Sequence, residues 1–364
     1  MRYVLIFFSV IVLLGILSFI LLLKVKQKID STLSAPLPHS QISVTPPTKL
    51  HQISETNSIL FVPYWVDGID VEKLESYNTL VYFGVAASEQ GIDKQDDGYK
   101  NLSTFLKSTN GKQSYLTIRM LESKSNFVIL KDERLQDTLI AESVKLAKEN
   151  GFKGILLNIE LSALPFTSLV DQITQFNKKF YTESKKYGLS YGITAYGDTF
   201  YRVRPFDIPA LAKDVDHMYL MAYDFHKSKG NPGPNFPLQG RTTYGYDLQT
   251  MIERFLEYIP HNKIVVVFGL YGYDWKVDEN NIAQDIGEPK SLIEIKNNLI
   301  DSCNQLSCEW RRDPLSSETE VKYIARDHTK HIVWFEDMES VKRKQSLLKQ
   351  KGISSFAFWA YSYF

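Results

Sequence analysis

The sequence predicts an α/β protein: a (β/α)8 TIM barrel with an insertion after its seventh strand, preceded by an N-terminal transmembrane helix. Three observations support this fold class. Eight short runs of apolar and aromatic residues recur from residue 58 onward, amphipathic helix-like stretches lie between several of them, and a long uncharged run opens the chain. Alternation of this kind is typical of a barrel of parallel strands covered by helices.

The candidate strands are short and dense in apolar residues, as expected for strands buried on both faces. They are residues 59–64, 79–85, 113–120, 154–159, 189–195, 217–223, 263–270 and 354–359. Helical patterns occupy residues 134–150, 168–186, 248–258 and 338–351. A doubly wound open sheet is the main alternative, but no glycine-rich phosphate loop follows the first strand.

Residues 276–336 break the alternation with a long polar segment. We expect an inserted loop or a small hairpin subdomain there, because long loops on a barrel usually shape the substrate cleft. The segment contains Cys303 and Cys308, which could form a small-loop disulfide outside the cell or remain two unpaired thiols inside it. The three basic residues 342–344 are expected on a solvated helix face.

The first 28 residues indicate a membrane anchor. Residues 3–23 form a run of 21 residues without charge, and such a helix is about 31 Å long, enough to cross a bilayer core. A cleavable signal peptide has a shorter apolar region before small residues, whereas Lys24, Lys26 and Lys28 follow here. We expect an uncleaved signal anchor in the lipid bilayer; a removed signal peptide and a buried soluble helix are the alternatives.

The composition excludes several classes of protein. Lys and Arg number 42, as do Asp and Glu, so the basic excess of a nucleic-acid-binding protein is missing and no nucleic-acid partner is expected. With 44% hydrophobic and 23% charged residues the chain is in the ordinary globular range. Two cysteines are too few for a disulfide-rich scaffold. Aromatic residues at 13% fit a large core or a site that stacks sugars.

The C-terminal ends of barrel strands normally hold the site, and polar residues stand at two of them. The fourth strand ends with Asn158 and Glu160, which face the same side because side chains alternate along a strand. A Glu there can act as a general acid, although a solvated Glu at a strand end is the alternative. The sixth strand ends with Tyr223 and Asp224, a pair that can hold a polar ligand or merely pack at the rim and cap a turn.

Taken together, these strand ends resemble glycoside hydrolase family 18, the chitinase family, and most closely its bacterial branch of spore-cortex and spore-germination hydrolases. The family's Asp-Gly-x-Asp-x-Asp-x-Glu signature aligns with residues 153–160, which keep the catalytic Glu as Glu160. Asn158 replaces the last Asp, and Lys153 and Leu156 stand at the two earlier Asp positions. The third strand also departs from the family, since residues 117–120 read Thr-Ile-Arg-Met where Ser-x-Gly-Gly is usual.

Four further motifs carry the resemblance. The sixth-strand Met-x-Tyr-Asp is intact from Met221 to Asp224, and the eighth-strand Trp matches Trp359. The Tyr-Gly-Tyr-Asp-Trp of the germination branch is intact at residues 271–275, and residues 334–337 are similar to the segment before that branch's last helix.

The resemblance implies substrate-assisted catalysis, an exception to the two-carboxylate scheme. Glu160 would protonate the glycosidic oxygen, and the substrate's own 2-acetamido oxygen would attack the anomeric carbon to form an oxazolinium ion that water opens with retention. Tyr223 would bond the acetamido group, Asp224 would support the site, and Trp359 would form its floor. No metal or organic cofactor is implied. Further candidates for substrate contacts are Met221, Tyr64, Trp65, Tyr271 and Trp275.

The implied function is a membrane-anchored glycosidase that hydrolyses β-1,4-linked N-acetylglucosamine in peptidoglycan or chitin-like glycans. Asn158 keeps a hydrogen bond but lacks the charge of the usual Asp, and losing one preorganised electrostatic partner costs on the order of 10²–10³ in rate. A related family of endo-β-N-acetylglucosaminidases nevertheless uses an Asn two residues before its acid. One alternative is therefore a barrel that binds N-acetylglucosamine polymers without cutting them, and another is a membrane-tethered scaffold for protein partners.

The orientation of the anchor rests on two opposing signals. Three lysines follow the span and only Arg2 and the α-amino group precede it, which by the positive-inside rule keeps the C-terminal part in the cytoplasm. Residues 29–57, however, are rich in Ser, Thr and Pro, as in an exposed stalk, and the implied polysaccharide is normally outside the cell. We expect a single-pass cell-membrane protein whose catalytic domain, residues 58–364, is extracellular.

Overall fold

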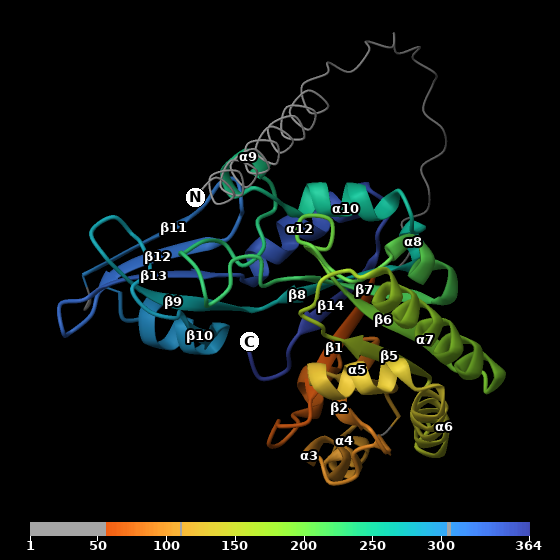
Figure 1. The fold of residues 1–364 in the computed structure, drawn as a ribbon. Coiled ribbons are helices and arrows are strands. Elements are labelled where there is room, and N and C mark those ends of the chain that lie inside the picture. The colour runs from red at the N-terminus through yellow and green to blue at the C-terminus, as the bar shows by residue number, and fades with distance from the viewer. Residues whose placement is uncertain (1–55, 110, 304–306) are drawn as a thin grey trace, which may run out of the picture. The chain divides into compact units, whose positions relative to one another are not determined.

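The computed structural model describes residues 56–109, 111–303 and 307–364. In this part of the chain, eight parallel strands form a closed barrel, because β1 pairs with β2 on one side and with β14 on the other (Figure 1). The predicted (β/α)8 TIM barrel is thereby confirmed. The barrel strands are β1 (Asn57–Pro63), β2 (Thr79–Ser88), β4 (Gln113–Met120), β5 (Gly154–Ile159), β6 (Ser190–Tyr196), β7 (His217–Ala222), β8 (Ile264–Gly269) and β14 (Ser355–Trp359).

The barrel forms because apolar side chains alternate between its interior and its outer surface. On β1, Ile59 and Phe61 belong to the inner cluster, whereas Leu60 and Val62 belong to the cluster that includes the surrounding helices. All six residues of β8 are buried. Parallel strands covered on both faces read as continuous apolar runs, which is why the strands could be located in the sequence to within a few residues.

Helices cover the outside of the barrel. The predicted helix at 168–186 is α7 (Thr167–Lys186), whose buried residues Leu169, Ile173, Phe176 and Phe180 recur at helical spacing. The α6 helix (Glu133–Glu149) begins after Asp132, whose carboxylate caps it. The remaining helices are α2 (Val71–Leu74), α3 (Asp97–Lys100), α4 (Leu102–Ser108), α5 (Ser123–Lys131), α6 (Glu133–Glu149), α8 (Ile208–Leu211), α9 (Arg241–Tyr244), α10 (Leu248–Leu256), α11 (Leu292–Ile295) and α12 (Met338–Gln350).

The insertion is larger than the loop or hairpin that the sequence predicts. It is a five-stranded antiparallel sheet in the order β10-β9-β13-β12-β11, which extends away from the barrel in Figure 1. It also begins earlier than residue 276, because the chain leaves the barrel after Gly269 and β9 pairs with β13. The strands are β9 (Tyr271–Val277), β10 (Glu288–Ser291), β11 (Cys308–Arg312), β12 (Thr319–Ile324) and β13 (Lys330–Phe335). A short strand, β3 (Gly91–Ile92), forms a hairpin with β2.

Two details of this region bear on the sequence predictions. Cys303 and Cys308 form a disulfide, with their Cα atoms 5.4 Å apart. Lys342 and Arg343 are exposed as expected, but Lys344 is fully buried. The prediction of a solvated Lys344 is wrong because this position of α12 faces the core, where its ammonium group meets two buried carboxylates.

The predicted anchor over residues 1–28 lies outside the described residues, as does the predicted stalk up to residue 55. Among the helices of residues 56–109, 111–303 and 307–364, none combines the length and the apolar character that crossing a bilayer requires.

Candidate active site

A cavity of about 350 Å³ opens at the C-terminal ends of the barrel strands. This is the end at which barrel enzymes place their sites, because the loops there vary independently of the strands. Nine of the residues proposed from the sequence line it: Tyr64, Trp65, Asn158, Glu160, Met221, Tyr223, Asp224, Tyr271 and Trp359.

Asn158 and Glu160 extend into the cavity from the end of β5. The Asn158 amide Nδ2 donates to Glu160 Oε1 at 3.1 Å, and Asn158 Oδ1 accepts from the Thr194 hydroxyl of β6 at 2.6 Å. A hydroxyl donor at Oδ1 fixes which end of the amide faces the carboxylate. The site therefore presents one carboxyl group whose orientation is set by a neighbouring amide, an arrangement suited to proton transfer at a bound ligand.

Tyr223 follows β7 and provides a hydrogen-bond donor in the same cavity as Glu160. Burial raises the pKa of Tyr223 well above its usual value of 10, and the nearby Glu160 carboxylate raises it further. A phenol with so high a pKa keeps its proton across the pH range in which proteins are stable. Its hydroxyl can therefore donate to a carbonyl oxygen in the cavity.

Asp224 has a specialised backbone and two tyrosine partners. Its φ of 57° lies in the left-handed region, which side chains other than glycine adopt at a cost. Its backbone N–H donates to Asn235 Oδ1 at 2.7 Å. The hydroxyls of Tyr271 and Tyr273 both donate to its Oδ1, the latter at 2.7 Å.

Aromatic rings form the floor and one wall of the cavity. The Trp359 ring at the end of β14 contacts Phe83 edge-on, with centroids 4.7 Å apart, and lies 6.2 Å from the Trp65 ring. Trp65 is 43% exposed and lines the cavity, so part of its ring is open to a ligand. Flat apolar faces beside polar groups are the combination that binds pyranose rings.

Trp275 does not belong to this cavity, contrary to its placement among the sugar contacts. It shares a face of β9 with Tyr271 and Tyr273, but it lies further along the strand, where it is 0% exposed within the core of the inserted sheet. Its indole N–H donates to the Ser228 carbonyl at 3.3 Å. Strand alternation gives the face of a side chain and not its depth, so the motif at residues 271–275 could not show that Trp275 lies away from the cavity.

Arg119 lines the cavity from β4 and was not among the residues predicted from the sequence. Its guanidinium lies 4.4 Å from the centre of the Tyr64 ring, donates to the Gly84 carbonyl and pairs with Asp96 at 2.6 Å. Arg119 is directly opposite Asn158 in the strand register. The departure at residues 117–120 was the signal that could have pointed to it, since a strand-end arginine replaces small residues there.

A second missed group lies after β6. Asp198 is 5% exposed and lines the cavity, where Arg202 and Arg204 neutralise it. The Arg204 guanidinium stacks on Tyr196, 4.0 Å from the ring centre. Lys227 also lines the cavity. No strand pattern marks Asp198, because it lies in a loop beyond the strand end.

Comparisons with known proteins give a family match and several relatives. A model of the glycosyl hydrolases family 18 matches residues 42–363. The cortical fragment-lytic enzyme of Bacillus subtilis is 24% identical over 240 residues, 64% of this chain and 52% of that protein. Mouse chitotriosidase-1 is 23% identical over 246 residues, 62% of this chain and 52% of that protein. The chain thus spans about half the length of these curated relatives.

Solved structures share the fold. The spore cortex-lytic enzyme SleL of Bacillus cereus superimposes with a TM-score of 0.69 at 20% identity, covering 90% of this chain and 75% of that one. A mutant of a class V chitinase from Nicotiana tobaccum, in complex with NAG4, gives a TM-score of 0.71 at 15% identity, covering 85% of this chain and 95% of that one. The resemblance seen in the sequence, including its spore-cortex branch, is confirmed, and the chain belongs to the glycosyl hydrolases family 18.

Proposed function

We propose that this protein is a membrane-anchored glycosidase that hydrolyses β-1,4-linked N-acetylglucosamine in peptidoglycan or chitin-like glycans. The observation that carries the proposal is Glu160 at the end of β5, with the Asn158 amide 3.1 Å from its carboxylate and Tyr223 in the same cavity. Relatives named as a cortical fragment-lytic enzyme and a chitotriosidase, and a structural neighbour solved with NAG4, support this substrate class.

The proposed reaction is substrate-assisted and retains the anomeric configuration. Glu160 donates its proton to the glycosidic oxygen as the bond to the anomeric carbon breaks. The 2-acetamido oxygen attacks that carbon from the opposite face and forms an oxazolinium ion. Water then attacks the anomeric carbon, and Glu160 takes a proton from that water. The oxazolinium ring opens and the acetamido group is restored.

Asn158 and Tyr223 would orient the acetamido group for this attack. A carbonyl oxygen has two lone pairs, so Asn158 Oδ1 can accept the acetamido N–H while it keeps the hydrogen bond from Thr194. The Tyr223 hydroxyl would donate to the acetamido oxygen, and Trp359 would support the sugar ring from below. A neutral amide stabilises the positive oxazolinium less than a carboxylate does, so we expect a slow enzyme.

Asn158 also favours a second candidate function, a barrel that binds N-acetylglucosamine polymers without cutting them. The two proposals share the aromatic floor and differ only in turnover. Retention of Glu160 beside Tyr223 favours the hydrolase, because a binding site does not require a proton donor at the reacting oxygen.

We further propose that residues 1–28 anchor the protein and that the barrel lies outside the cell. The uncharged run 3–23 supports the anchor. The disulfide between Cys303 and Cys308 supports an extracellular barrel, because disulfides persist mainly in oxidising compartments. Protease protection of the full chain in sealed vesicles, compared before and after permeabilisation, tests this orientation.

The test of activity uses the full chain in mild detergent, with a fluorogenic chitooligosaccharide and purified peptidoglycan as substrates. Glu160→Gln is the comparison variant. Cleavage by the unsubstituted chain that disappears in Glu160→Gln, with a first-formed product of retained configuration by NMR, is the expected result. Tight oligosaccharide binding without cleavage by either protein would establish the binding barrel instead.

A further inference from the structure

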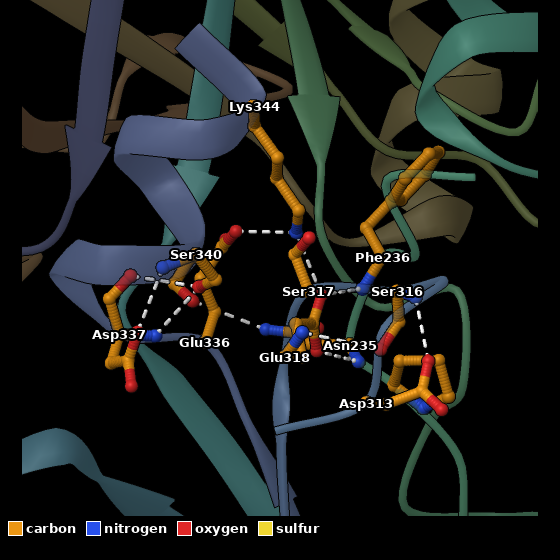
Figure 2. Close-up of polar contacts among 12 residues, drawn as sticks. Asn235, Phe236, Asp313, Ser316, Ser317, Glu318, Glu336, Asp337, Ser340 and Lys344 are labelled. Atoms are coloured by element: carbon orange, nitrogen blue, oxygen red, sulfur yellow. Dashed lines mark hydrogen bonds and ion pairs between the residues drawn. The ribbon is translucent and has the colours of Figure 1, made fainter. Parts of the chain in front are cut away.

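A fully buried cluster of three ionisable side chains lies outside the cavity, where the inserted sheet meets the last helix. Lys344 extends from α12 toward Glu318, which precedes β12, and Glu336, which follows β13 (Figure 2). All three side chains are 0% exposed, and the Lys344 ammonium contacts Glu318 at 2.7 Å as well as Glu336. Removing charges from water is costly, so a cluster this deep needs further hydrogen bonds.

Glu318 receives those hydrogen bonds from a loop of the barrel. Its Oε2 accepts the backbone N–H of Asn235 at 2.5 Å, and its Oε1 accepts the N–H of Phe236 at 2.8 Å. Asn235 and Phe236 lie in the long loop after β7, more than 80 positions earlier in the chain. One carboxylate therefore joins the inserted sheet, the last helix and a loop at the mouth of the barrel.

Asn235 connects the loop held by Glu318 to the active site, because it binds the backbone of Asp224 and Phe225. It is 2% exposed, and its Oδ1 accepts the Asp224 backbone N–H at 2.7 Å, while its carbonyl accepts the Phe225 N–H at 2.7 Å. Its Nδ2 donates to the carbonyls of Gly269 and Tyr271 at 3.1 and 3.3 Å. Asn235 thus ties the end of β7 to the end of β8 and the start of β9.

Asp224 needs such support because of its backbone conformation. A left-handed φ of 57° persists at an Asp only where its surroundings determine it. The same conformation places the Asp224 carboxylate against the hydroxyls of Tyr271 and Tyr273 at the cavity.

We propose that Glu318 and Lys344 are positioning residues for the hydrolysis proposed above: they fix Asn235, and Asn235 holds Asp224 in the geometry that the site requires. The inference rests on that proposed function for its kinetic readout. Replacing buried ion pairs by apolar residues is often neutral or stabilising for proteins. The cluster is therefore not needed for stability alone. Because Glu318 accepts two backbone hydrogen bonds from the loop beside the cavity, we infer that the cluster fixes that loop.

Asn235→Ala in the full chain is the main test, because it removes the contact to Asp224 and leaves the ion cluster intact. We expect kcat to fall about 10- to 100-fold, the range for displaced active-site groups, with KM changed by less than about threefold. Asn177→Ala is the matched control. Asn177 is also fully buried and makes two hydrogen bonds, to the Asp214 carbonyl and from Tyr191, but it lies on α7 away from the cavity.

A double-mutant cycle separates positioning from a general loss of stability. In an Asp224→Asn background, Asn235→Ala should lower kcat by less than about threefold, because its effect acts through Asp224. Lys344→Met should lower kcat in the same non-additive way. If Asn235→Ala lowered kcat by the same factor in the Asp224→Asn background as in the unsubstituted chain, the cluster would serve stability alone. The same conclusion would follow if Asn235→Ala and Asn177→Ala lowered kcat equally.

Amide hydrogen exchange tests the proposal even if the unsubstituted chain cleaves no glycan. We expect the amides of Asp224 and Phe225 to exchange at least about tenfold faster in Lys344→Met and Asn235→Ala, while those of β5 keep their rates. Unchanged exchange at Asp224 and Phe225 would overturn the proposal. If the amides of Asp224 and Phe225 exchanged faster in the variants but the unsubstituted chain cleaved no glycan, the positioning contact would be supported and only the proposed hydrolysis would be rejected.

Discussion

The Thr194 hydroxyl on β6 donates a 2.6 Å hydrogen bond to Asn158 Oδ1 on β5, and this contact sets the direction in which the Asn158 amide faces Glu160. The neighbouring strand therefore orients the residue that departs from the family pattern. An amide that turned over would offer its oxygen to the Glu160 carboxylate, and two acceptors would then oppose each other.

Thr194→Val should lower kcat by about 3- to 10-fold, the equivalent of one neutral hydrogen bond, because the Asn158 amide loses its fixed orientation. Steady-state kinetics on the chitooligosaccharide provide the measurement. Thr117→Val is the matched control: Thr117 is a buried threonine of β4 whose hydroxyl has no hydrogen-bond partner among the described residues. If both variants slowed equally, the Thr194 contact would have no specific role.

Asn158→Asp should raise kcat about 10-fold or more, because a carboxylate stabilises the oxazolinium better than an amide does. The new carboxylate would stand about 3 Å from Glu160, where two carboxyl groups share a proton. The alkaline limb of kcat/KM should therefore move to higher pH. A pH profile of both proteins tests this expectation, and a drop in kcat in the variant would show that the site is built around the amide.

Trp359→Phe should raise KM about 3- to 10-fold through loss of ring area under the sugar. Trp275→Phe should leave KM unchanged and lower Tm, since Trp275 is buried in the inserted sheet and its indole N–H donates to Ser228. Kinetics and thermal unfolding of the two variants give the comparison. A raised KM in Trp275→Phe with an unchanged Tm would show that Trp275 contacts the substrate.

Stability should fall with rising pH because of Glu336. Burial, opposed by Lys344 and reinforced by Glu318, raises the pKa of Glu336 from its usual 4.5 to about 8 in the folded protein. Between these values the unfolded chain releases a proton that the folded chain keeps, so the free energy of unfolding decreases as pH rises. Denaturant unfolding at several pH values measures the slope.

Glu336→Gln should flatten that slope between about pH 4.5 and pH 8, because the titrating group is gone. Glu339→Gln serves as the control, since Glu339 lies only three positions later, in the first turn of α12, but is about half exposed and paired with Arg343. An unchanged slope in Glu336→Gln would assign the pH dependence to other groups.

The barrel could be predicted because its strands are continuous apolar runs. The strands 113–120 and 154–159 agree with β4 and β5 to the residue. The inserted sheet could not be predicted, because strands such as β10 (Glu288–Ser291) are short and polar. Its pairing also joins β9 to β13 across a long stretch of sequence, and no local pattern records such a contact.

The site could be predicted where a motif stands at a strand end and not where partners come from elsewhere. Glu160 and Tyr223 follow apolar strands, so alternation places them at the barrel mouth. Lys344 directly follows two exposed basic residues, and its partner Glu318 is 26 positions away. No residue close to Lys344 in the sequence indicates that carboxylate. The sequence therefore led to the wrong prediction that Lys344 lies on a solvated helix face.

Because β14 lies between β1 and β8, synthesis of the chain leaves the barrel wall open until residues 355–359 have emerged from the ribosome. Until then the unpaired edges of β1 and β8 can associate with other nascent chains. The floor of the cavity, Trp359, arrives with the same strand. The cavity and the closed wall are therefore completed in one late step, so a chain whose translation is interrupted before residue 355 lacks both the closing strand and the Trp359 ring.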